Sequence, residues 1–341
     1  MLSGLRLSQY IAKHIFMQNS DSSAPTWLDL QVVAKNSIAQ GIVAFELALA
    51  DGSQLPAFAA GAHIGVRTPS GAQRNYSLYN DPDERQRYCI AVKRDAAGRG
   101  GSMSMADDLH IGHTLAVRTP DNAFALHPRA KKFLFIAGGI GITPIMAMLA
   151  QVQATQAGDF KLVYCTRDAG STAFIQELSA PEFKGKVSIH HDHGQPGDAF
   201  DFWPLLEKPA AGTHIYCCGP RGLMDAVKDM SGHWPFGTVH FESFGVDASL
   251  RQSNRAFDIS LQSTGQTLHV DANTSMLEAL RAHGIQVRSS CESGTCGSCK
   301  TPLLSGTCEH RDYVLTEDEQ ESHVMVCVSR AAVGESLVLG I

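Results

Sequence analysis

The sequence lacks any apolar run that approaches the length of a membrane-spanning helix. Basic residues are not in excess, because 28 Lys and Arg stand against 34 Asp and Glu, and this balance argues against nucleic-acid binding. The first residues have no small-residue cleavage site of a signal peptide, and Met17 is an alternative start to Met1. No internal repeat is visible. We therefore expect a cytoplasmic protein whose 341 residues form two or three domains.

The cysteines that are present form one informative pattern near the C-terminus. Residues 291–300 read CESGTCGSCK, a C-x4-C-x2-C run, and 27 residues separate Cys327 from the last of these cysteines. This is the plant-type [2Fe–2S] spacing, in which four thiolates hold two irons. Structural cysteines or a zinc site are the alternative, although zinc favours paired C-x2-C units. The predicted metal ligands are Cys291, Cys296, Cys299 and Cys327, and Cys308 is predicted to bind no iron.

A cluster of this type passes one electron at a time, so the rest of the chain must supply or receive electrons. The five cysteines outside the ligand set suit a reducing cytosol rather than an exported protein.

Acidic charge is concentrated in the same part of the chain as the cluster. Residues 246–341 hold 12 acidic and 7 basic residues, whereas residues 1–245 hold 22 and 21.

Two different rhythms precede the cysteine pattern. Short alternating runs such as IVAFELALA (42–50) and RYCIAVKR (87–94) are separated by Gly and Pro turns, which predicts an antiparallel β-barrel. Continuous apolar runs such as KFLFIAGG (132–139) then alternate with helical stretches, which predicts a doubly wound parallel sheet. Helices are expected from Pro144 onward and at 173–180, 202–208 and 222–230.

The last segment begins with a hairpin pattern (256–270) and a helical one (275–284), compatible with a small mixed sheet crossed by one helix. The polar stretch before it has no periodicity and is interpreted as a linker. The fold class is thus multidomain: an antiparallel β-barrel, an α/β doubly wound parallel sheet and an α+β domain. The expected boundaries are 1–26 for an N-terminal extension, 27–126 for the barrel, 127–245 for the parallel-sheet domain, 246–254 for the linker and 255–341 for the cluster domain.

Two segments of the barrel carry the residue types of a cofactor site. In RNYSLYN (74–80), Arg74 offers a fixed cation for a phosphate, Tyr76 a flat face and Ser77 a short hydroxyl. In AVKRDAAGRGGS (91–102), a glycine-rich loop offers backbone amides that could cradle a phosphate. Each segment alone could be an edge strand or a surface loop. Together they favour a cofactor site.

The strand, loop and helix at 133–148, FLFIAGGIGITPIMAM, predict a nucleotide-binding turn. Gly138, Gly139 and Gly141 remove side chains where a backbone must approach a pyrophosphate, and a helix start offers free N–H groups. Pro144 stands where the third glycine of the Rossmann pattern would be. A tight strand-to-helix turn without a ligand is the alternative.

Three further motifs fall at expected strand ends of the parallel sheet, where ligands of such sheets bind. CCGP (217–220) places Cys218 there, and HFESFG (240–245) places Glu242, Ser243 and Phe244 at the same rim. Phe241 is instead expected to pack in the core. HHDHG (190–194) lacks metal-ligand spacing, so a loop role or a nucleotide contact is favoured over a metal site.

RNYSL, GGIGITP, CCGP and HFESFG, in this order, resemble the signature of the ferredoxin-reductase-like family of flavin reductases. The C-terminal cysteine pattern adds a plant-type ferredoxin, as in the reductases that serve Rieske oxygenases. AVKRDAAGRGGS, HHDHG, GHWP, SSCESGTCGSCK and MVCVSR are similar to members of the phthalate class. The resemblance runs from about residue 27 to the C-terminus, and it implies a β-grasp fold for the ferredoxin domain.

The resemblance implies FMN in the barrel, NADH on the parallel-sheet domain and [2Fe–2S] in the ferredoxin domain. It implies that Phe244 covers the flavin ring until nicotinamide displaces it, and that Arg167 and Asp168 lie at the adenine ribose. An aspartate there disfavours the 2′-phosphate of NADPH, whereas Arg167 weakens that argument. The implied flavin-binding residues are Arg74, Asn75, Tyr76, Ser77, Ala91, Val92, Lys93, Gly98, Gly100, Gly101 and Ser102. The implied nucleotide-binding residues are Gly139, Gly141, Thr143, Pro144, Arg167, Asp168, Cys218, Gly219, Pro220, Glu242 and Phe244, and the implied catalytic residues are Ser77, Cys218 and Phe244.

The implied activity is electron transfer in which NADH gives a hydride to the flavin and single electrons leave through the cluster to the Rieske centre of an oxygenase, that of phthalate oxygenation above all. No general acid or base is expected, since the cofactors carry the chemistry. The alternatives are a reductase for a vanillate-type O-demethylase or a carnitine-type monooxygenase, a redox sensor, and a flavin reductase with a vestigial ferredoxin. The intact ligand set and the flavin and nucleotide motifs argue against the last two.

Overall fold

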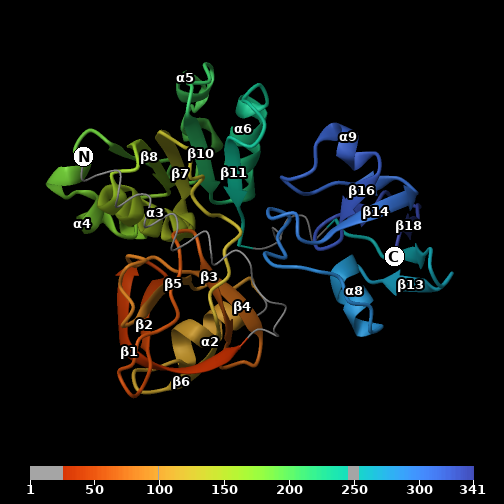
Figure 1. Ribbon diagram of the computed structural model, residues 1–341, viewed down its shortest axis with the longest axis horizontal. Coiled ribbons are helices and arrows are strands. Elements are labelled where there is room, and N and C mark those ends of the chain that lie inside the picture. Colours follow the sequence, from red (N-terminus) through yellow and green to blue (C-terminus); the bar gives the residue numbers. More distant parts are fainter. Residues whose placement is uncertain (1–25, 99, 245–252) are drawn as a thin grey trace. The chain divides into compact units, whose positions relative to one another are not determined.

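The computed structural model describes residues 26–98, 100–244 and 253–341 (Figure 1). The chain divides between His240 and Phe241 into two compact units. The expected N-terminal extension (1–26) and linker (246–254) lie almost entirely outside the described residues. No helix within the described ranges is long and apolar enough to cross a membrane.

The first unit begins with a six-stranded antiparallel sheet in the order β4-β3-β6-β1-β2-β5. A bridge between Leu78 and Ile90, with a 3.0 Å hydrogen bond from Tyr79 N to Cys89 O, joins the two outer strands and closes the sheet. The expected antiparallel barrel is therefore confirmed. Its strands are β1 (Trp27–Ala39), β2 (Ile42–Ala48), β3 (His63–Arg67), β4 (Gln73–Ser77), β5 (Tyr88–Lys93) and β6 (Thr114–Arg118), and helix α2 (Gly101–Asp108) lies between β5 and β6 in sequence.

Alternation of side chains along the strands fills the barrel. Phe45 and Leu47 of β2, two residues apart, are both fully buried, because side chains at this spacing share one face of a strand. Met105 of α2 belongs to the same apolar core. Helix α2 is thereby fixed to the barrel at its middle, which leaves its N-terminus to meet the strand ends.

The second part of the first unit is a five-stranded sheet in the order β11-β10-β7-β8-β9. The β7–β8, β8–β9 and β7–β10 pairs are parallel, so the expected doubly wound sheet is confirmed. The strand order reverses between β7 and β10, the position at which such sheets bind ligands. The strands are β7 (Lys132–Gly138), β8 (Asp159–Thr166), β9 (Val187–His191), β10 (Thr213–Cys218) and β11 (Val239–Glu242).

Two of the helices that connect these strands are shorter than the sequence predicts. The helix expected at 173–180 is one turn, since Phe174 before it has a φ of 59° and Pro181 follows it. The helix expected at 202–208 is also one turn, because Pro209 disfavours helical angles at the residue before it. The helices are α3 (Ile142–Thr155), α4 (Ile175–Leu178), α5 (Trp203–Leu206) and α6 (Arg221–Ser231), with 3-10 turns η2 (Gly139–Gly141), η3 (Ala169–Ser171), η4 (Pro181–Phe183) and η5 (Pro196–Asp198).

The second unit is a mixed sheet in the order β13-β12-β18-β14-β16, with β12 and β18 parallel and the other three pairs antiparallel. Helix α8 begins at a capping box in which Ser275 and Glu278 each accept the other's backbone N–H. The expected small mixed sheet crossed by one helix is confirmed. The elements are β12 (Phe257–Leu261), β13 (Thr267–Val270), α8 (Met276–Ala282), β14 (Lys300–Ser305), β15 (Cys308–Glu309), α9 (Glu317–Gln320), β16 (His323–Met325), β17 (Arg330–Ala331) and β18 (Leu337–Leu339).

Candidate functional site

The four cysteines predicted as cluster ligands form two pairs in the second unit. The side chains of Cys291 and Cys296 hydrogen-bond to each other, and so do those of Cys299 and Cys327. The bond with Cys296 lowers the pKa of Cys291 to about 4, and the bond with Cys327 lowers the pKa of Cys299, because each pair shares one proton. A [2Fe–2S] cluster takes two thiolates per iron, so the arrangement fits that group.

The backbone of the cysteine loop turns toward these sulfurs. The Ser293 N–H donates to Cys291 Sγ at 3.4 Å, and the Gly294 N–H donates to the sulfur of Cys327. Gly294 has a φ of 77°, and a Cβ there would lie 2.7 Å from Val328 Cγ2, so only glycine fits this position. Backbone N–H groups that face sulfur stabilise negative charge on it.

The alternatives to the predicted cluster site are a structural zinc site and a ligand role for Cys308. A structural zinc site needs four ligands around one point. Among the residues that the structure describes, no group of three or more His, Cys, Asp or Glu side chains is placed to hold a metal ion. Cys308 lies on β15 opposite Ala331, and burial raises the pKa of its thiol to about 12. Its exclusion from the ligand set stays a prediction that this environment supports.

Arg74 and the first residue of helix α2 come together in the barrel. A Cβ on Gly101 would lie 3.0 Å from Arg74 Nε, so the guanidinium lies against the helix start. No side chain caps this helix, and Gly100 before it has a φ of 81°. Uncapped helix N–H groups and an arginine are both anion ligands, so the residues present fit a phosphate. Arg99, within the predicted loop at 98–102, lies outside the described residues.

The other predicted flavin residues divide between the two faces of their strands. Ser77 is buried at the end of β4, and burial raises the pKa of Tyr76 to about 12, so its phenol stays neutral. Val92 packs in the barrel core, whereas Ala91 belongs to the core that includes the parallel sheet. Lys93 is exposed, as are Asn75 and Gly98, while Ser102 accepts a hydrogen bond from the Asp95 N–H. Val92 and, in part, Tyr76 thus pack against the barrel core, whereas Ala91 lies on the side of the parallel sheet.

The three glycines of the predicted nucleotide turn have different reasons to be glycine. A Cβ on Gly138 would lie 2.6 Å from Pro220 Cδ, and a Cβ on Gly141 would lie 2.2 Å from the carbonyl oxygen of Cys218. Gly139, with a φ of 52°, has nothing within 4 Å. Gly138 and Gly141 therefore permit this turn to pack against the turn after β10. The sequence predicts instead that they let the backbone approach a pyrophosphate. Only Gly139 leaves open space where a ligand could approach.

Helix α3 follows this turn without a side-chain cap, but the Ile142 N–H already donates to the Gly139 carbonyl and Pro144 has no N–H. Thr143 and Pro144 are buried, and the Thr143 hydroxyl donates to the Ile140 carbonyl at 3.1 Å. Their predicted contact with the nucleotide stays a prediction. Cys218 is fully buried and Pro220 precedes α6, so the predicted CCGP motif lies at the switch point beside Gly141.

Arg167 and Asp168 follow β8 and are exposed. Asp168 caps η3 through a 2.8 Å hydrogen bond from Ser171 N, and this bond lowers the pKa of the carboxyl. The neighbouring histidines have local partners: His191 Nδ1 bonds to Thr166 Oγ1 at 2.9 Å, and His190 Nε2 to the Asp198 carbonyl at 2.6 Å. A loop role for these histidines is consistent with these bonds.

The last motif crosses into the second unit. Glu242 is buried at the end of β11, and Phe244 beyond it is half-exposed. Phe244 belongs to the second compact unit, whereas the barrel residues belong to the first. Phe241 packs on the ring of Tyr313 with centroids 5.1 Å apart, in agreement with the expected packing role. The coverage of a flavin by Phe244 stays a prediction.

Two residues that position these sites gave no signal in the sequence. Lys35 Nζ donates to the carbonyls of Ala106 and Leu109 at 2.8 and 2.7 Å, which fixes the far end of α2. The Tyr164 hydroxyl donates to the Gly139 carbonyl at 3.1 Å and supports the nucleotide turn. Their partners lie 25 to 74 residues away in sequence, so no local pattern could have revealed them.

Comparison with known proteins agrees with both cofactor domains. Residues 259–332 match the family described as 2Fe-2S iron-sulfur cluster binding domain, and residues 29–125 match the family described as oxidoreductase FAD-binding domain. The chain is 57% identical over 315 residues to the phthalate 4,5-dioxygenase oxygenase reductase subunit of Pseudomonas putida, covering 92% of this chain and 97% of the relative. It is 52% identical over 309 residues to the phthalate dioxygenase reductase of Burkholderia cepacia, covering 91% and 96%.

A solved structure of phthalate dioxygenase reductase, described as a modular structure for electron transfer from pyridine nucleotides to [2Fe-2S], also matches this fold. The TM-score is 0.73 at 51% identity, over 92% of this chain and 98% of that one. The resemblance seen in the sequence motifs is therefore confirmed. The chain belongs to the phthalate dioxygenase reductase family, and it is an oxidoreductase with a flavin domain and a [2Fe–2S] domain, of the kind that forms the reductase component of an oxygenase system.

Proposed function

We propose that this chain is the NADH-dependent reductase of a cytoplasmic phthalate dioxygenase system, with FMN as its flavin. The observation that carries the proposal is identity above 50% to two phthalate dioxygenase reductases along nearly the whole of each protein. The domain boundaries and ligand residues expected from the sequence are part of the proposal. When bound, the flavin accepts a hydride from the nicotinamide and the cluster carries single electrons.

The protein's own contribution is binding and orientation. Arg74 and the start of α2 are proposed to hold the flavin phosphate, since the guanidinium lies against a helix start that no side chain caps. Tyr76, Ser77 and Ala91 are proposed to line the flavin, and Cys218 and Phe244 keep their predicted roles at the nicotinamide. Cys291, Cys296, Cys299 and Cys327 are proposed to hold the cluster, because they are the four thiols that already form two pairs.

The preference for NADH rests on the charge that follows β8. Asp168 is exposed, and its hydrogen bond from Ser171 N lowers the pKa of the carboxyl, which keeps it negative at neutral pH. A carboxylate accepts the ribose 2′-hydroxyl and repels a 2′-phosphate. Arg167 beside it opposes this preference, so NADH over NADPH is a proposal for kinetics to test.

The test uses the purified full chain. Released flavin is identified by mass, iron and acid-labile sulfide are measured, and kcat/KM is compared for NADH and NADPH. FMN, two irons and two sulfides per chain, and a preference for NADH are expected. Release of FAD in place of FMN would overturn the flavin assignment. Equal kcat/KM for NADH and NADPH would overturn the nucleotide assignment.

The partner is tested by reconstitution with purified oxygenases. Coupled product formation is measured with the oxygenase of a phthalate system, of a vanillate-type O-demethylase and of a carnitine-type monooxygenase, each with its own substrate. The phthalate oxygenase should turn over fastest at equal reductase concentration. Faster turnover with either of the others would assign this chain to that system.

A further inference from the structure

Asp312 is a buried carboxylate that no proposed step uses. It lies between β15 and α9, with 4% of its surface exposed. Its Oδ1 accepts the N–H groups of Val314 at 3.0 Å and Leu315 at 2.8 Å. A side chain that accepts the N–H groups two and three residues ahead fixes a tight turn. Asp312 thus holds the turn at 312–315.

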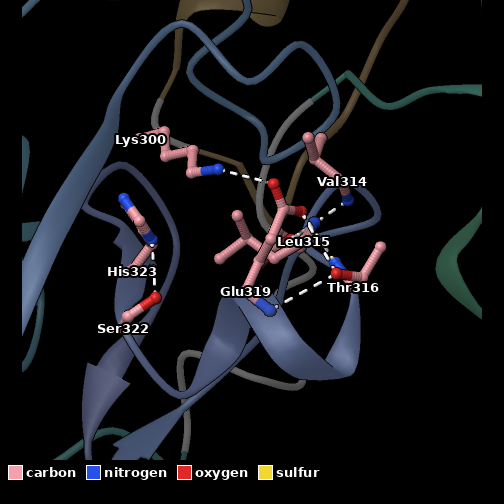
Figure 2. A network of polar contacts seen from close by, with 8 residues as sticks. Lys300, Val314, Leu315, Thr316, Glu319, Ser322 and His323 are labelled. Atoms are coloured by element: carbon pink, nitrogen blue, oxygen red, sulfur yellow. Dashed lines mark hydrogen bonds and ion pairs between the residues drawn. The ribbon is translucent and has the colours of Figure 1, made fainter.

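A second carboxylate holds the end of the same segment. Glu319 accepts the Thr316 N–H at 3.0 Å and the Lys300 ammonium at 2.6 Å, and Figure 2 shows both bonds meeting at this side chain. Lys300 follows Cys299 directly in sequence. The segment at 312–319 is therefore tied to the strand that leaves the cysteine loop.

The turn held by Asp312 touches the cysteine loop at both of its glycines. The Tyr313 N–H donates to the Gly294 carbonyl at 2.9 Å, and a Cβ on Gly294 would lie 3.2 Å from Asp312 Cα. A Cβ on Gly297 would lie 3.4 Å from Val314 Cγ1. Ser293, next to Gly294 in the chain, donates its N–H to Cys291 Sγ at 3.4 Å. A continuous set of contacts therefore runs from the Asp312 carboxylate to one predicted ligand sulfur.

We propose that Asp312 is a positioning residue for the cluster, through the turn that holds Gly294 and so keeps the neighbouring Ser293 N–H on the sulfur of Cys291. This inference rests on the cluster of the proposed function. Hydrogen bonds to ligand sulfur stabilise the reduced, more negative state and raise the reduction potential. The charge of the carboxylate has the opposite effect, since a nearby anion disfavours added negative charge. The two effects can be separated because they depend on different properties of the side chain.

Two neutral variants make that separation. Asp312→Asn removes the charge but keeps an oxygen that can accept the Val314 and Leu315 N–H groups, whereas Asp312→Ala removes both. The reduction potential is measured by redox titration of the full chain, followed by the electron paramagnetic resonance signal of the reduced cluster. We expect Asn to titrate above wild type and Ala below Asn, with a broadened signal for Ala alone. Asp318→Asn, a change to an exposed acid of α9, should leave potential and line shape as in wild type.

Equal potentials and equal line shapes for the two neutral variants, at full iron and sulfide content, would overturn the proposal and leave only a charge effect. Failure of Ala to take up a cluster that Asn does take up would support it. If the Ala variant does not fold, the isosteric pair Asp312→Thr and Asp312→Val repeats the comparison, since the Thr hydroxyl accepts an N–H and Val does not. A wild-type chain without a [2Fe–2S] signal would contradict the proposed function, which is a different result.

Discussion

The four predicted ligand cysteines differ from four of the other five cysteines in what surrounds the sulfur. Burial raises the pKa of Cys89, Cys165 and Cys308 to about 12, and that of Cys217 well above its usual value. Burial also acts on the predicted ligands, but the largest effect there is the hydrogen bond within each thiol pair, which lowers the pKa of one partner and raises that of the other. Because iron binds thiolate, these surroundings favour cluster formation at one place in the chain.

Replacement of Cys299 tests the predicted electron path at a single atom. Cys299→Ala removes one of the two thiols of its pair, and the other ligands cannot complete the set. NADH-dependent reduction of cytochrome c should fall by at least 100-fold, about 3 kcal/mol in the barrier. Ferricyanide, which accepts electrons from the flavin, should be reduced at close to the wild-type rate.

Cys308→Ala is the matched control for that variant. Cys308 belongs to the same unit and lies opposite Ala331 on a neighbouring strand, and it is not a member of the two thiol pairs. The Cys308→Ala protein should retain cytochrome c reduction, ferricyanide reduction and the full iron content. Equal loss of both activities in Cys299→Ala would contradict the order of electron transfer, and iron loss in Cys308→Ala would contradict the ligand assignment.

Gly141 carries a prediction about stability. A Cβ at this position would lie 2.2 Å from the carbonyl oxygen of Cys218 and 2.5 Å from its carbon, so the turns after β7 and β10 would have to separate. Overpacking of this kind costs roughly 1–3 kcal/mol, and more when backbone must move. Gly141→Ala should therefore lower the free energy of unfolding of the first unit by about 2 kcal/mol or more.

Urea unfolding followed by tryptophan fluorescence measures this change, because Trp27, Trp203 and Trp234 all belong to the first unit. Gly222→Ala is the control. Its Cβ would meet nothing within 4 Å, and alanine favours the helix, so this variant should be unchanged or slightly more stable. A Gly141→Ala protein as stable as wild type would show that the two turns are not closely packed.

At the scale of elements, aromatic side chains of β10, β11 and the segment before β7 form one stacked column. The His127 and His214 ring centroids lie 4.4 Å apart, His214 and His240 5.3 Å, and His240 and Tyr216 4.5 Å, all at interplanar angles of 16° or less. His214 Nδ1 and His240 Nε2 lie 3.0 Å apart and share a hydrogen bond. Burial lowers the pKa of His240 to about 4 and also lowers that of His214, with further lowering by the neighbouring histidines.

This column predicts loss of stability in acid. The folded-state pKa of His240 lies below the usual value of about 6.5, so the unfolded chain binds the extra proton first. The contribution is fully present above about pH 6.5 and is lost as the pH falls toward 4, by up to about 3 kcal/mol. His240→Phe keeps a ring in the column but cannot titrate. Its unfolding free energy should decline less than that of wild type between pH 6.5 and 4.

The measurement is the same tryptophan-detected unfolding, repeated across that range. His233→Phe, at an exposed histidine of the same unit, should follow the wild-type pH dependence. If His240→Phe and wild type lose stability in parallel, the column is not responsible for the acid sensitivity.

The elements that the sequence predicts well are those with a local signal. The glycine turn before α3 and the cysteine loop are specified by residues within a few positions of one another, and the structure has both. Helices α4 and α5 are shorter than the sequence predicts. The left-handed backbone of Phe174 delays the start of α4, and Pro209 limits the length of α5. Lys35 and Tyr164 bond to carbonyls that are far away in sequence and are brought close only by folding. Asp312 accepts nearby N–H groups, but the sequence pattern does not specify the geometry of the turn that it holds.

At the scale of the whole molecule, the chain combines an antiparallel barrel, a parallel-sheet domain and a small acidic ferredoxin domain. Residues 246–341 carry an excess of five acidic residues out of the net charge of −6. The predicted exit for electrons therefore lies in the part of the chain with the highest density of negative charge. Such a distribution steers positively charged protein acceptors and slows the approach of anions.

Electron delivery should therefore depend on ionic strength for an acceptor at the cluster and not for an acceptor at the flavin. Cytochrome c is basic, and its NADH-dependent reduction should fall several-fold between low salt and 0.2 M, because the screening length shrinks to less than about 10 Å. Ferricyanide accepts electrons from the flavin of the first unit, so its reduction should stay nearly constant over the same range. Initial rates in potassium chloride at a fixed, saturating NADH concentration measure both. A parallel fall of the two rates would indicate that salt acts on NADH or flavin binding in the first unit, whereas a fall for cytochrome c alone places the effect at the acidic ferredoxin unit.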